Sequence, residues 1–210
     1  MQLIGMLDSP FVRRVAVSLQ LLELPFAHRS LSVFRGFDEF RRINPVVKAP
    51  TLVCDDGSVL MESTLILEYA EALAAPRSLM PRSLADRLRA LRQIGLALIA
   101  CEKGVQIMLE RSVRPAEHQH TAWLERVQSQ LAAALSGIES GLSQQPLACT
   151  RETIDQPGIS CAVAWQFVQH AVPDRARLAA YPLLQAHSTA AELLEAFRRA
   201  PHGEGVVQSG

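Results

Sequence analysis

The stretch that decides the fold runs from residue 3 to residue 15 and reads LIGMLDSPFVRRV. Residues 3–6 form a short apolar run of the kind that becomes a buried strand. Pro10 suits the first turn of a helix, because its missing N–H would have no partner there in any case. Apolar residues then recur at helical spacing as far as Leu24, which precedes a proline. The stretch therefore predicts a strand that turns directly into a helix, with the Ser9 side chain at the N-terminal end of that helix.

The residues that follow predict more strands and one more helix. A weak second strand is expected at residues 26–31. A hairpin of strands 51–54 and 58–61 is better marked, because the Asp-Gly pair between them (residues 56–57) supports a tight turn with positive φ. A helix is expected from Ser63. The order strand-helix-strand, a link, and strand-strand-helix fits a four-stranded mixed sheet.

Beyond Pro81 the pattern is helical throughout. A long helix is expected to start at the capping-box-like Ser83 and Asp86 and to run to about Val113. Three further helices are expected: a long helix that stops at Gly141, and helices at residues 160–171 and 182–200. A linker between the two domains is expected at residues 74–81. The pattern thus predicts an α/β N-terminal domain with a four-stranded mixed sheet (residues 1–79) plus an all-α C-terminal helical domain (residues 83–210).

Composition excludes several classes of protein. Of the 210 residues, 21 are basic and 21 acidic, so a nucleic-acid partner, which needs a basic surplus, is not expected. No apolar run approaches the roughly 20 residues that span a bilayer, and the first residues do not resemble a signal peptide. The cysteines lie far apart, so we expect reduced, mostly buried thiols in a cytoplasmic protein and no metal site; they are Cys54, Cys101, Cys149 and Cys161.

Ser9 has two interpretations at the expected strand-to-helix turn. It can be an ordinary N-cap serine, which is the commoner case. The same position can serve chemistry, because the N-terminus of a helix carries a partial positive charge and free N–H groups that stabilise an anion such as a thiolate. A serine hydroxyl there could donate a hydrogen bond to that thiolate and lower the pKa of the thiol. No arrangement of His and Asp points to a serine nucleophile.

Two dipeptides further along the domain also have two interpretations each. Pro50 can simply begin the third strand, or a cis Ala49–Pro50 bond could turn the Ala49 backbone toward a peptide-like ligand. Ser63 can be a capping serine. Alternatively, Ser63 and the helix amides could hold a carboxylate while Glu62 takes an ammonium group, as a ligand with an amino-acid end requires.

In this order the motifs resemble those of the cytosolic glutathione S-transferases, over essentially the whole chain. The resemblance implies an α/β thioredoxin-like N-terminal domain, to which the three motifs belong, and an all-α C-terminal domain. The residues that carry the resemblance are SPFVRRV at 9–15, NPVVKAPTLV at 44–53 and Glu62-Ser63. The chain looks most like bacterial members of the family with an S-P-F-V-R-[KR]-V start. The helical half, with Arg111 and RPAE at 114–117, resembles the same group.

The resemblance implies roles for the motif residues. Ser9 stands at the position of the family's catalytic Ser or Cys and would activate the glutathione sulfur. Pro50 would be the cis proline, and the backbone of Ala49 would pair with the cysteinyl part of glutathione. Glu62 and Ser63 would bind the γ-glutamyl end.

The remaining site residues are assigned more loosely. Arg35 or Lys48 would approach the glycyl carboxylate of glutathione. Phe11, Met108 and Arg111 would line a pocket for the second, electrophilic substrate. For the last two the plain alternatives are that Met108 belongs to the core and Arg111 is a solvated charge.

The sequence departs from the family pattern at two places. Family members often have Gly where Val47 stands, so the loop before Pro50 could have a different shape. In the family, the helix near residue 160 commonly begins with a Ser/Thr-x-x-Asp capping motif. Here Pro157 stands at the Ser/Thr position and Ser160 at the Asp position. Losing that cap would weaken the helix start by about 1 kcal/mol.

The function expected from this resemblance is a glutathione S-transferase with a role in detoxification. It would act as a cytoplasmic homodimer that conjugates glutathione, its co-substrate, to small apolar electrophiles, with no metal, membrane or nucleic acid involved. The alternatives are a non-catalytic glutathione-binding or scaffold protein of the same fold and a glutathione-dependent peroxidase. The serine at position 9 argues against the thiol-disulfide chemistry of members with Cys there.

Overall fold

A computed structural model of the chain describes residues 1–174 and 180–208. They form two compact units, Met1–Leu79 with Leu193–Gly210 and Met80–Glu192, and each unit is described by itself. The C-terminal segment thus groups with the N-terminal residues, whereas the sequence places it in the helical domain. The reason is packing, because Phe197 is fully buried and lies under the guanidinium of Arg13, 5.6 Å from the ring centre.

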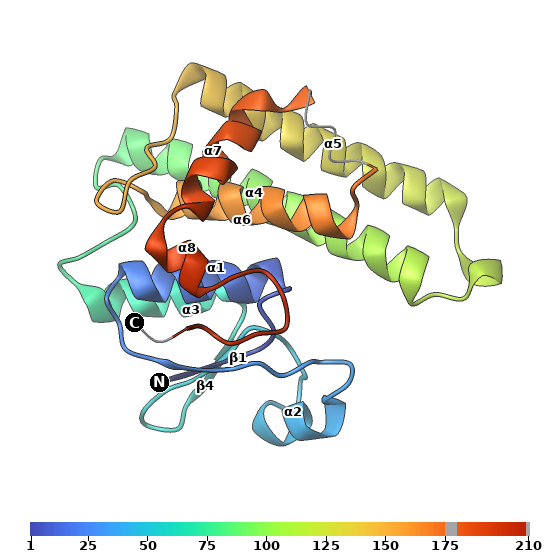
Figure 1. The fold of residues 1–210 in the computed structure, drawn as a ribbon, viewed down its shortest axis with the longest axis horizontal. Helices are drawn as coiled ribbons and strands as arrows, with labels where there is room; N and C mark the ends of the chain where they lie inside the picture. Colours follow the sequence, from blue (N-terminus) through green and yellow to red (C-terminus); the bar gives the residue numbers. More distant parts are fainter. Residues whose placement is uncertain (175–179, 209–210) are drawn as a thin grey trace. The chain divides into compact units, whose positions relative to one another are not determined.

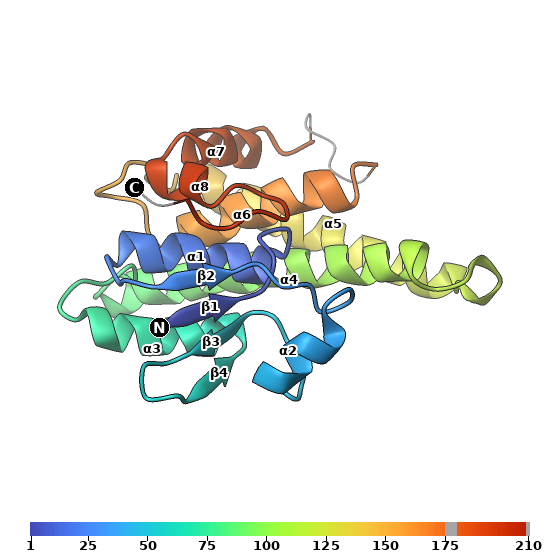
Figure 2. The same cartoon turned by 60° about the horizontal axis from the view of Figure 1, so that its bottom comes forward.

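The first unit is built on the expected four-stranded mixed sheet (Figure 2). Its strands are β1 (Gln2–Ile4), β2 (Ala27–Arg29), β3 (Thr51–Val53) and β4 (Val59–Met61), in the order β2-β1-β3-β4. β1 runs parallel to β2 and antiparallel to β3, which is antiparallel to β4. Strands β1 and β2 are shorter than the sequence predicts, and β1 ends at Ile4, directly before Gly5. At φ +137° that residue adopts a conformation that favours glycine, and a Cβ there would lie 2.6 Å from a methyl group of Val12.

Helix α1 (Pro10–Leu21) follows β1 and packs against α3 (Ser63–Ala74). It ends slightly before the expected Leu24, because Glu23 takes a positive φ of 58° and the Leu24 N–H bonds the carbonyl of Leu19.

Two short helices of this unit differ from the sequence prediction. The sequence predicts only a link between the second and third strands, yet α2 (Phe37–Ile43) lies there. It buries only Phe40, and Gly36 gives it no side-chain cap, so neither periodicity nor a cap marks it. The predicted helix at 182–200 is wrong, since it is interrupted after α7 (Pro182–Glu192) and continues as α8 (Glu195–Arg199). The interruption lets α8 pack on α1.

In the second unit the elements of the described residues are all helices. α4 (Leu84–Ser112) packs along α5 (Thr121–Gln144) and α6 (Gln156–Ala171), and α6 also packs against α7 (Figure 1). A 3-10 turn (Ala116–His118) lies between α4 and α5. α5 continues past the expected stop at Gly141.

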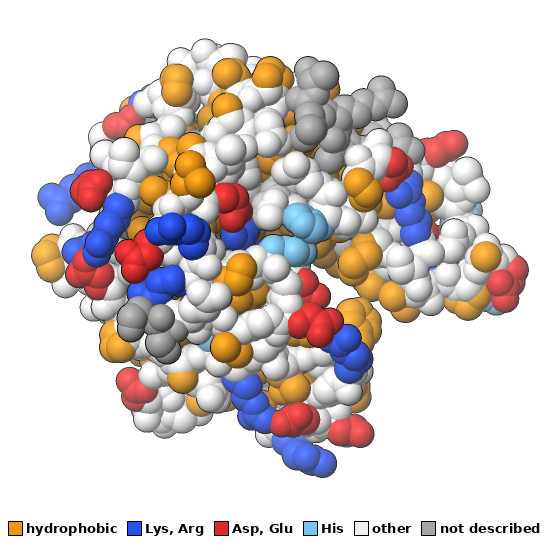
Figure 3. Space-filling view, in the orientation of Figure 1, with side chains coloured by type: hydrophobic (Ala, Val, Ile, Leu, Met, Phe, Trp, Pro, Cys, Tyr) orange, Lys and Arg blue, Asp and Glu red, His pale blue; other side chains and the backbone are white. Residues whose placement is uncertain are grey.

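The expected cap at Ser83 is confirmed, because its hydroxyl accepts the N–H of Asp86 at 3.1 Å. None of the helices in the described ranges is both long and apolar enough to cross a membrane. On the face drawn in Figure 3, acidic and basic side chains are interspersed, which agrees with the balanced net charge.

The prediction that α6 lacks an N-cap is wrong. α6 begins at Gln156 rather than at Ser160, and Asp155 caps it by accepting the N–H of Gly158 at 3.0 Å. Pro157 lies in the first helical turn, where its missing N–H costs nothing. The capping function is therefore present, two residues earlier in the chain than the family pattern places it.

Asp155→Ala is expected to lower the free energy of unfolding by about 1 kcal/mol, because it removes the cap of a buried helix. Asp155→Asn keeps an oxygen acceptor for the Gly158 N–H and serves as the matched control, and its stability should be at least that of the parent. Urea denaturation measures both. Equal losses in the two variants would show that the carboxylate charge, and not the cap, is what the helix needs.

The same pair of variants has a pH signature. Burial is the main cause that raises the pKa of Asp155 above its usual 3.8, although its backbone hydrogen bonds lower it. The unfolded chain therefore gives up this proton first as pH rises, and the parent should lose stability relative to Asp155→Asn from about pH 3.8 up to the raised pKa. If the free energies of unfolding of the parent and of Asp155→Asn changed in parallel over this pH range, the raised pKa of Asp155 would be contradicted.

Candidate functional site

The topology of the sheet brings the three predicted motifs to one edge (Figure 2). β1 leads out toward Ser9 at the end where Ile4 pairs with Thr51, the first residue of β3. Thr51 also pairs with Met61, the last residue of β4. The turn before α1, the loop before β3 and the start of α3 therefore meet at the same edge, although they are far apart in the sequence.

Ser9 is the N-cap of α1, as the sequence predicts, and Pro10 occupies the first helical turn. The Ser9 hydroxyl oxygen accepts the N–H of Val12 in a long hydrogen bond of 3.5 Å. That bond uses a lone pair and leaves the hydroxyl proton available, since a serine side chain can accept and donate at once. Among the described residues no acceptor takes this proton, and Ser9 is only half-buried. The capping and the chemical interpretations of Ser9 are therefore compatible.

The loop before β3 contains the expected cis Ala49–Pro50 bond. Its shape is held by Asn44, a buried side chain that donates to the Thr51 hydroxyl at 2.9 Å and accepts from the backbone at position 46. Val47 takes a φ of +53°, so this loop reaches the left-handed conformation without the glycine that is common there. The backbone N–H and C=O of Ala49 have no hydrogen-bond partner in the part of the chain that the structure describes.

At the start of α3 the cap is Glu62 and not Ser63. The Glu62 carboxylate accepts the N–H of Thr64 at 3.0 Å, and its backbone has a φ of +74°, which is rare for a residue with a side chain. Backbone strain of this kind is concentrated at functional sites. Ser63 is fully buried, accepts from Arg14 at 3.1 Å and donates to Glu62 at 3.4 Å. Of the Glu62-Ser63 pair, only Glu62 is thus exposed to solvent.

Arg35 is held by the C-terminal segment, which the sequence analysis did not connect with the site. Its guanidinium lies 2.6 Å from the carboxylate of Glu204, and both side chains are mostly exposed. Burial is the main cause that raises the pKa of the neighbouring Asp8, with Glu204 raising it and Arg35 lowering it. Lys48, the alternative to Arg35, is exposed and its carbonyl accepts from Thr51. No local pattern could have revealed the pairing of Arg35 with a residue near the other end of the chain.

His28 fixes the same segment to the sheet. Its Nδ1 accepts the N–H of Val207 at 3.0 Å, so its Nε2 carries the proton and donates to the carbonyl of Gly5 at 2.8 Å. Burial lowers the pKa of this imidazole, which favours the neutral form that both bonds require.

The residues predicted for the electrophile pocket are divided between the two units, so that pocket stays a prediction. Phe11 is half-buried on α1. Met108 and Arg111 lie on α4, and Met108 is also half-buried. Arg111 makes a two-pronged ion pair with Asp174 at 2.9 and 3.1 Å, which is the main cause that raises its pKa. It is therefore an ion-paired residue and not a freely solvated charge.

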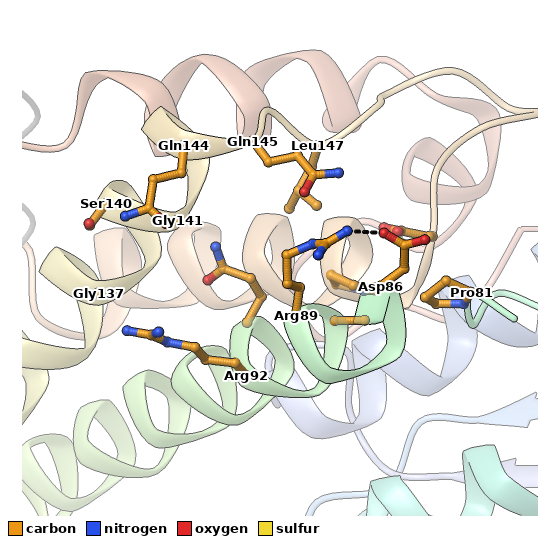
Figure 4. A pocket seen from close by; sticks show the side chains of 14 residues that line it. Pro81, Asp86, Arg89, Arg92, Gly137, Ser140, Gly141, Gln144, Gln145 and Leu147 are labelled. Carbon is orange, nitrogen blue, oxygen red and sulfur yellow. Dashed lines mark hydrogen bonds and ion pairs between the residues drawn. The ribbon is translucent and has the colours of Figure 1, made fainter. Parts of the chain in front are cut away.

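The helical unit also has a pocket of about 330 Å³ that the sequence analysis missed (Figure 4). It lies between α4 and α5, where Gly137 and Gly141 leave room and where Arg89 forms an ion pair with Asp86. A Cβ on Gly141 would lie 1.7 Å from the Gln93 amide nitrogen, so the Gln93 side chain fills the space that this glycine leaves. The cluster of charged and amide side chains in it has no counterpart among the predicted site residues.

Comparison with known proteins agrees with this geometry. Residues 3–78 match the family model for the glutathione S-transferase N-terminal domain. The GST-like protein YibF of Escherichia coli (strain K12) is 25% identical over 173 residues, which make up 82% of this chain and 85% of YibF. The family match thus covers the N-terminal residues, and the similarity to the GST-like protein YibF extends over most of the chain.

Solved structures show the same fold. A glutathione S-transferase of Methylobacterium radiotolerans, in complex with glutathione sulfonate, has a TM-score of 0.87 at 23% identity and covers 100% of this chain and 98% of its own. A glutathione transferase family member of Pseudomonas fluorescens Pf-5 with bound glutathione has a TM-score of 0.78 at 26% identity, over 94% and 96% of the two chains. A maleyl pyruvate isomerase, a bacterial Zeta-class glutathione S-transferase, has a TM-score of 0.74 at 24% identity and covers 98% of each chain. The fold is therefore a thioredoxin-like domain with an α-helical domain, as in glutathione S-transferases.

Proposed function

We propose that this protein is a glutathione S-transferase that conjugates the glutathione thiolate to small apolar electrophiles. The observation that carries the proposal is the Ser9 hydroxyl. It caps a helix with its oxygen, keeps its proton unused, and stands at the edge of the sheet where the Ala49 backbone is also unpaired. That combination suits a thiol-containing peptide better than it suits a purely structural turn.

In this proposal each part of glutathione meets matching chemistry. The Ser9 O–H donates to the sulfur, and with the N-terminus of α1 it lowers the pKa of the thiol, so that more thiolate is present at neutral pH. The N–H and C=O of Ala49 bond the cysteinyl backbone in the manner of an added strand. Glu62 binds the ammonium group of the γ-glutamyl end of glutathione, and Ser63 lies beside the carboxylate of that same end.

The outer parts of the ligand are assigned less directly. Arg35 is one candidate for binding the glycyl carboxylate of glutathione. That carboxylate would have to displace the Glu204 carboxylate from the Arg35 guanidinium. The exposed Lys48 is the other candidate. Phe11, Met108 and Arg111 are the candidates for the electrophile pocket. We further propose a cytoplasmic homodimer that acts in detoxification.

A second candidate function is a glutathione-dependent isomerase. It is favoured by the similarity to the Zeta-class maleyl pyruvate isomerase. Both functions need the same glutathione thiolate, and they differ in whether glutathione ends in the product or is released again.

The test combines binding with turnover. Retention on immobilised glutathione, followed by assays with aryl halides, epoxides, hydroperoxides and a cis-dienoic acid such as maleylpyruvate, separates the candidates. We expect retention and a stable glutathione conjugate from at least one electrophile. Retention without any turnover would favour a scaffold, consumption of hydroperoxide alone a peroxidase, and isomerisation without consumption of glutathione an isomerase. Absence of retention would overturn the proposal.

A further inference from the structure

A buried arginine lies directly behind the proposed γ-glutamyl site. Arg14, on α1, is only 3% exposed. Its Nη1 donates to the Ser63 hydroxyl at 3.1 Å and to the Thr64 hydroxyl at 3.3 Å. A guanidinium is rarely buried to this extent unless specific acceptors hold it. Here two of its acceptors are the first two side chains of α3.

This contact dictates where the two hydroxyl protons point. A hydroxyl oxygen that accepts from a guanidinium must use its own proton as a donor toward a different group. The buried Ser63 hydroxyl has the Glu62 carboxylate at 3.4 Å as its acceptor. Thr64 is exposed, and in the described ranges no acceptor takes its hydroxyl proton. Thr64 therefore offers a donor toward solvent at the place where an anion would lie.

The charge of Arg14 adds to the field of the helix. The N-terminus of α3 carries the partial positive charge of its free N–H groups. A guanidinium buried behind the first turn is screened less by salt than a surface charge would be. Glu62, on the exposed side, supplies the opposite charge. The N-terminal end of α3 thus places the negative charge of Glu62 beside a region of positive electrostatic potential. This pair of charges complements the ammonium and carboxylate groups of an amino acid.

We propose that Arg14 is a positioning residue for the γ-glutamyl carboxylate of glutathione, and that the Thr64 hydroxyl is the exposed group through which it acts. Arg14 fixes the Ser63 and Thr64 oxygens as acceptors and so directs the Thr64 proton to the carboxylate. The inference rests on the proposed function, because it concerns a subsite of the proposed glutathione site.

The test measures discrimination between two ligands by isothermal titration calorimetry. One ligand is glutathione, and the other is its analogue with the γ-glutamyl α-carboxylate converted to the amide. Arg14→Met is expected to weaken glutathione binding about 30-fold and amide binding less than about threefold, so that discrimination is largely lost. Arg14→Lys restores part of it. Thr64→Val removes one acceptor of Arg14 and leaves its bond to the buried Ser63 hydroxyl in place. It is expected to weaken glutathione binding about tenfold and to weaken binding of the amide analogue less, as in Arg14→Met.

The matched control is Arg13→Met. Arg13 is the neighbouring buried arginine of α1, and it bonds the carbonyl of Ala200 at 2.8 Å on the C-terminal segment. This variant measures the general cost of losing a buried arginine and should keep the parent's discrimination. If Arg14→Met does not fold, Thr64→Val decides the matter alone. Unchanged discrimination in Thr64→Val, or equal weakening of both ligands, would overturn the inference. A parent protein that binds neither ligand would overturn the proposed function and, with it, the inference.

Discussion

Ser9→Ala is expected to lower kcat/KM for conjugation by about 100-fold while glutathione binding changes less than threefold. The hydroxyl donates to the thiolate, and removing one donor aimed at a developing or resident anion has effects of this size. The other contacts of glutathione, to Ala49 and Glu62, do not involve Ser9, so affinity should persist. Because the lost hydrogen bond stabilises the charged form, the pKa of the bound thiol should rise. The rate profile and the ultraviolet absorbance of the thiolate should both shift to higher pH.

The control for this variant is Ser83→Ala. Ser83 caps α4 in the way that Ser9 caps α1, accepting a backbone N–H at 3.1 Å. Both substitutions remove a serine cap and should lower the free energy of unfolding by about 1 kcal/mol. Only Ser9→Ala should change the pH profile. If both variants keep full turnover, Ser9 is a capping residue alone, and the proposed chemistry is wrong.

Glu62→Gln is expected to weaken glutathione binding by about 10- to 100-fold. A hydrogen bond to a charged group contributes about 1.5–3 kcal/mol, and the substitution removes the negative partner of the γ-glutamyl ammonium. The amide oxygen of Gln can still accept the Thr64 N–H, so the cap of α3 should survive and the melting temperature should change little. Calorimetric titration with glutathione measures the affinity.

Glu68→Gln makes the same change of charge elsewhere on α3, at an exposed residue. It should leave glutathione affinity within a factor of two of the parent. A similar loss in both variants would mean that net charge near α3, and not a contact with the ammonium group, governs binding. Binding of a des-amino glutathione that is insensitive to Glu62→Gln would strengthen the assignment.

Much of the fold could be predicted because the deciding signals are local. Pro10 after a polar residue marks a helix start, Asp-Gly marks a hairpin, and Ser83 with Asp86 marks a capped helix, each within a few residues. The prediction failed where local signals are weak or compete. α2 has one buried residue and no side-chain cap. The start of α6 was misplaced because Asp155, two residues earlier than the family pattern, supplies the cap.

In the candidate site, too, the residues in local motifs could be predicted from the sequence, whereas their surroundings could not. Ser9, Pro50 and Glu62 stand in recognisable motifs, and the order of the strands explains why the motifs meet at one edge. The roles of these residues in binding and catalysis remain predictions that the variants above test. Their immediate environment came only from the three-dimensional structure. It buries Ser63, makes Glu62 the cap, and leaves the Ser9 proton without an acceptor among the described residues.

The sequence by itself determined that a strand turns into a capped helix at Ser9, because caps and turns depend on a few consecutive residues. Only the tertiary structure decided that Arg14 lies behind the start of α3 and that Glu204, 169 residues further along the chain, holds Arg35. Contacts of this kind arise when elements distant in sequence bury their apolar faces together. The polar partners that such burial brings within reach cannot be identified from the neighbouring residues of either one.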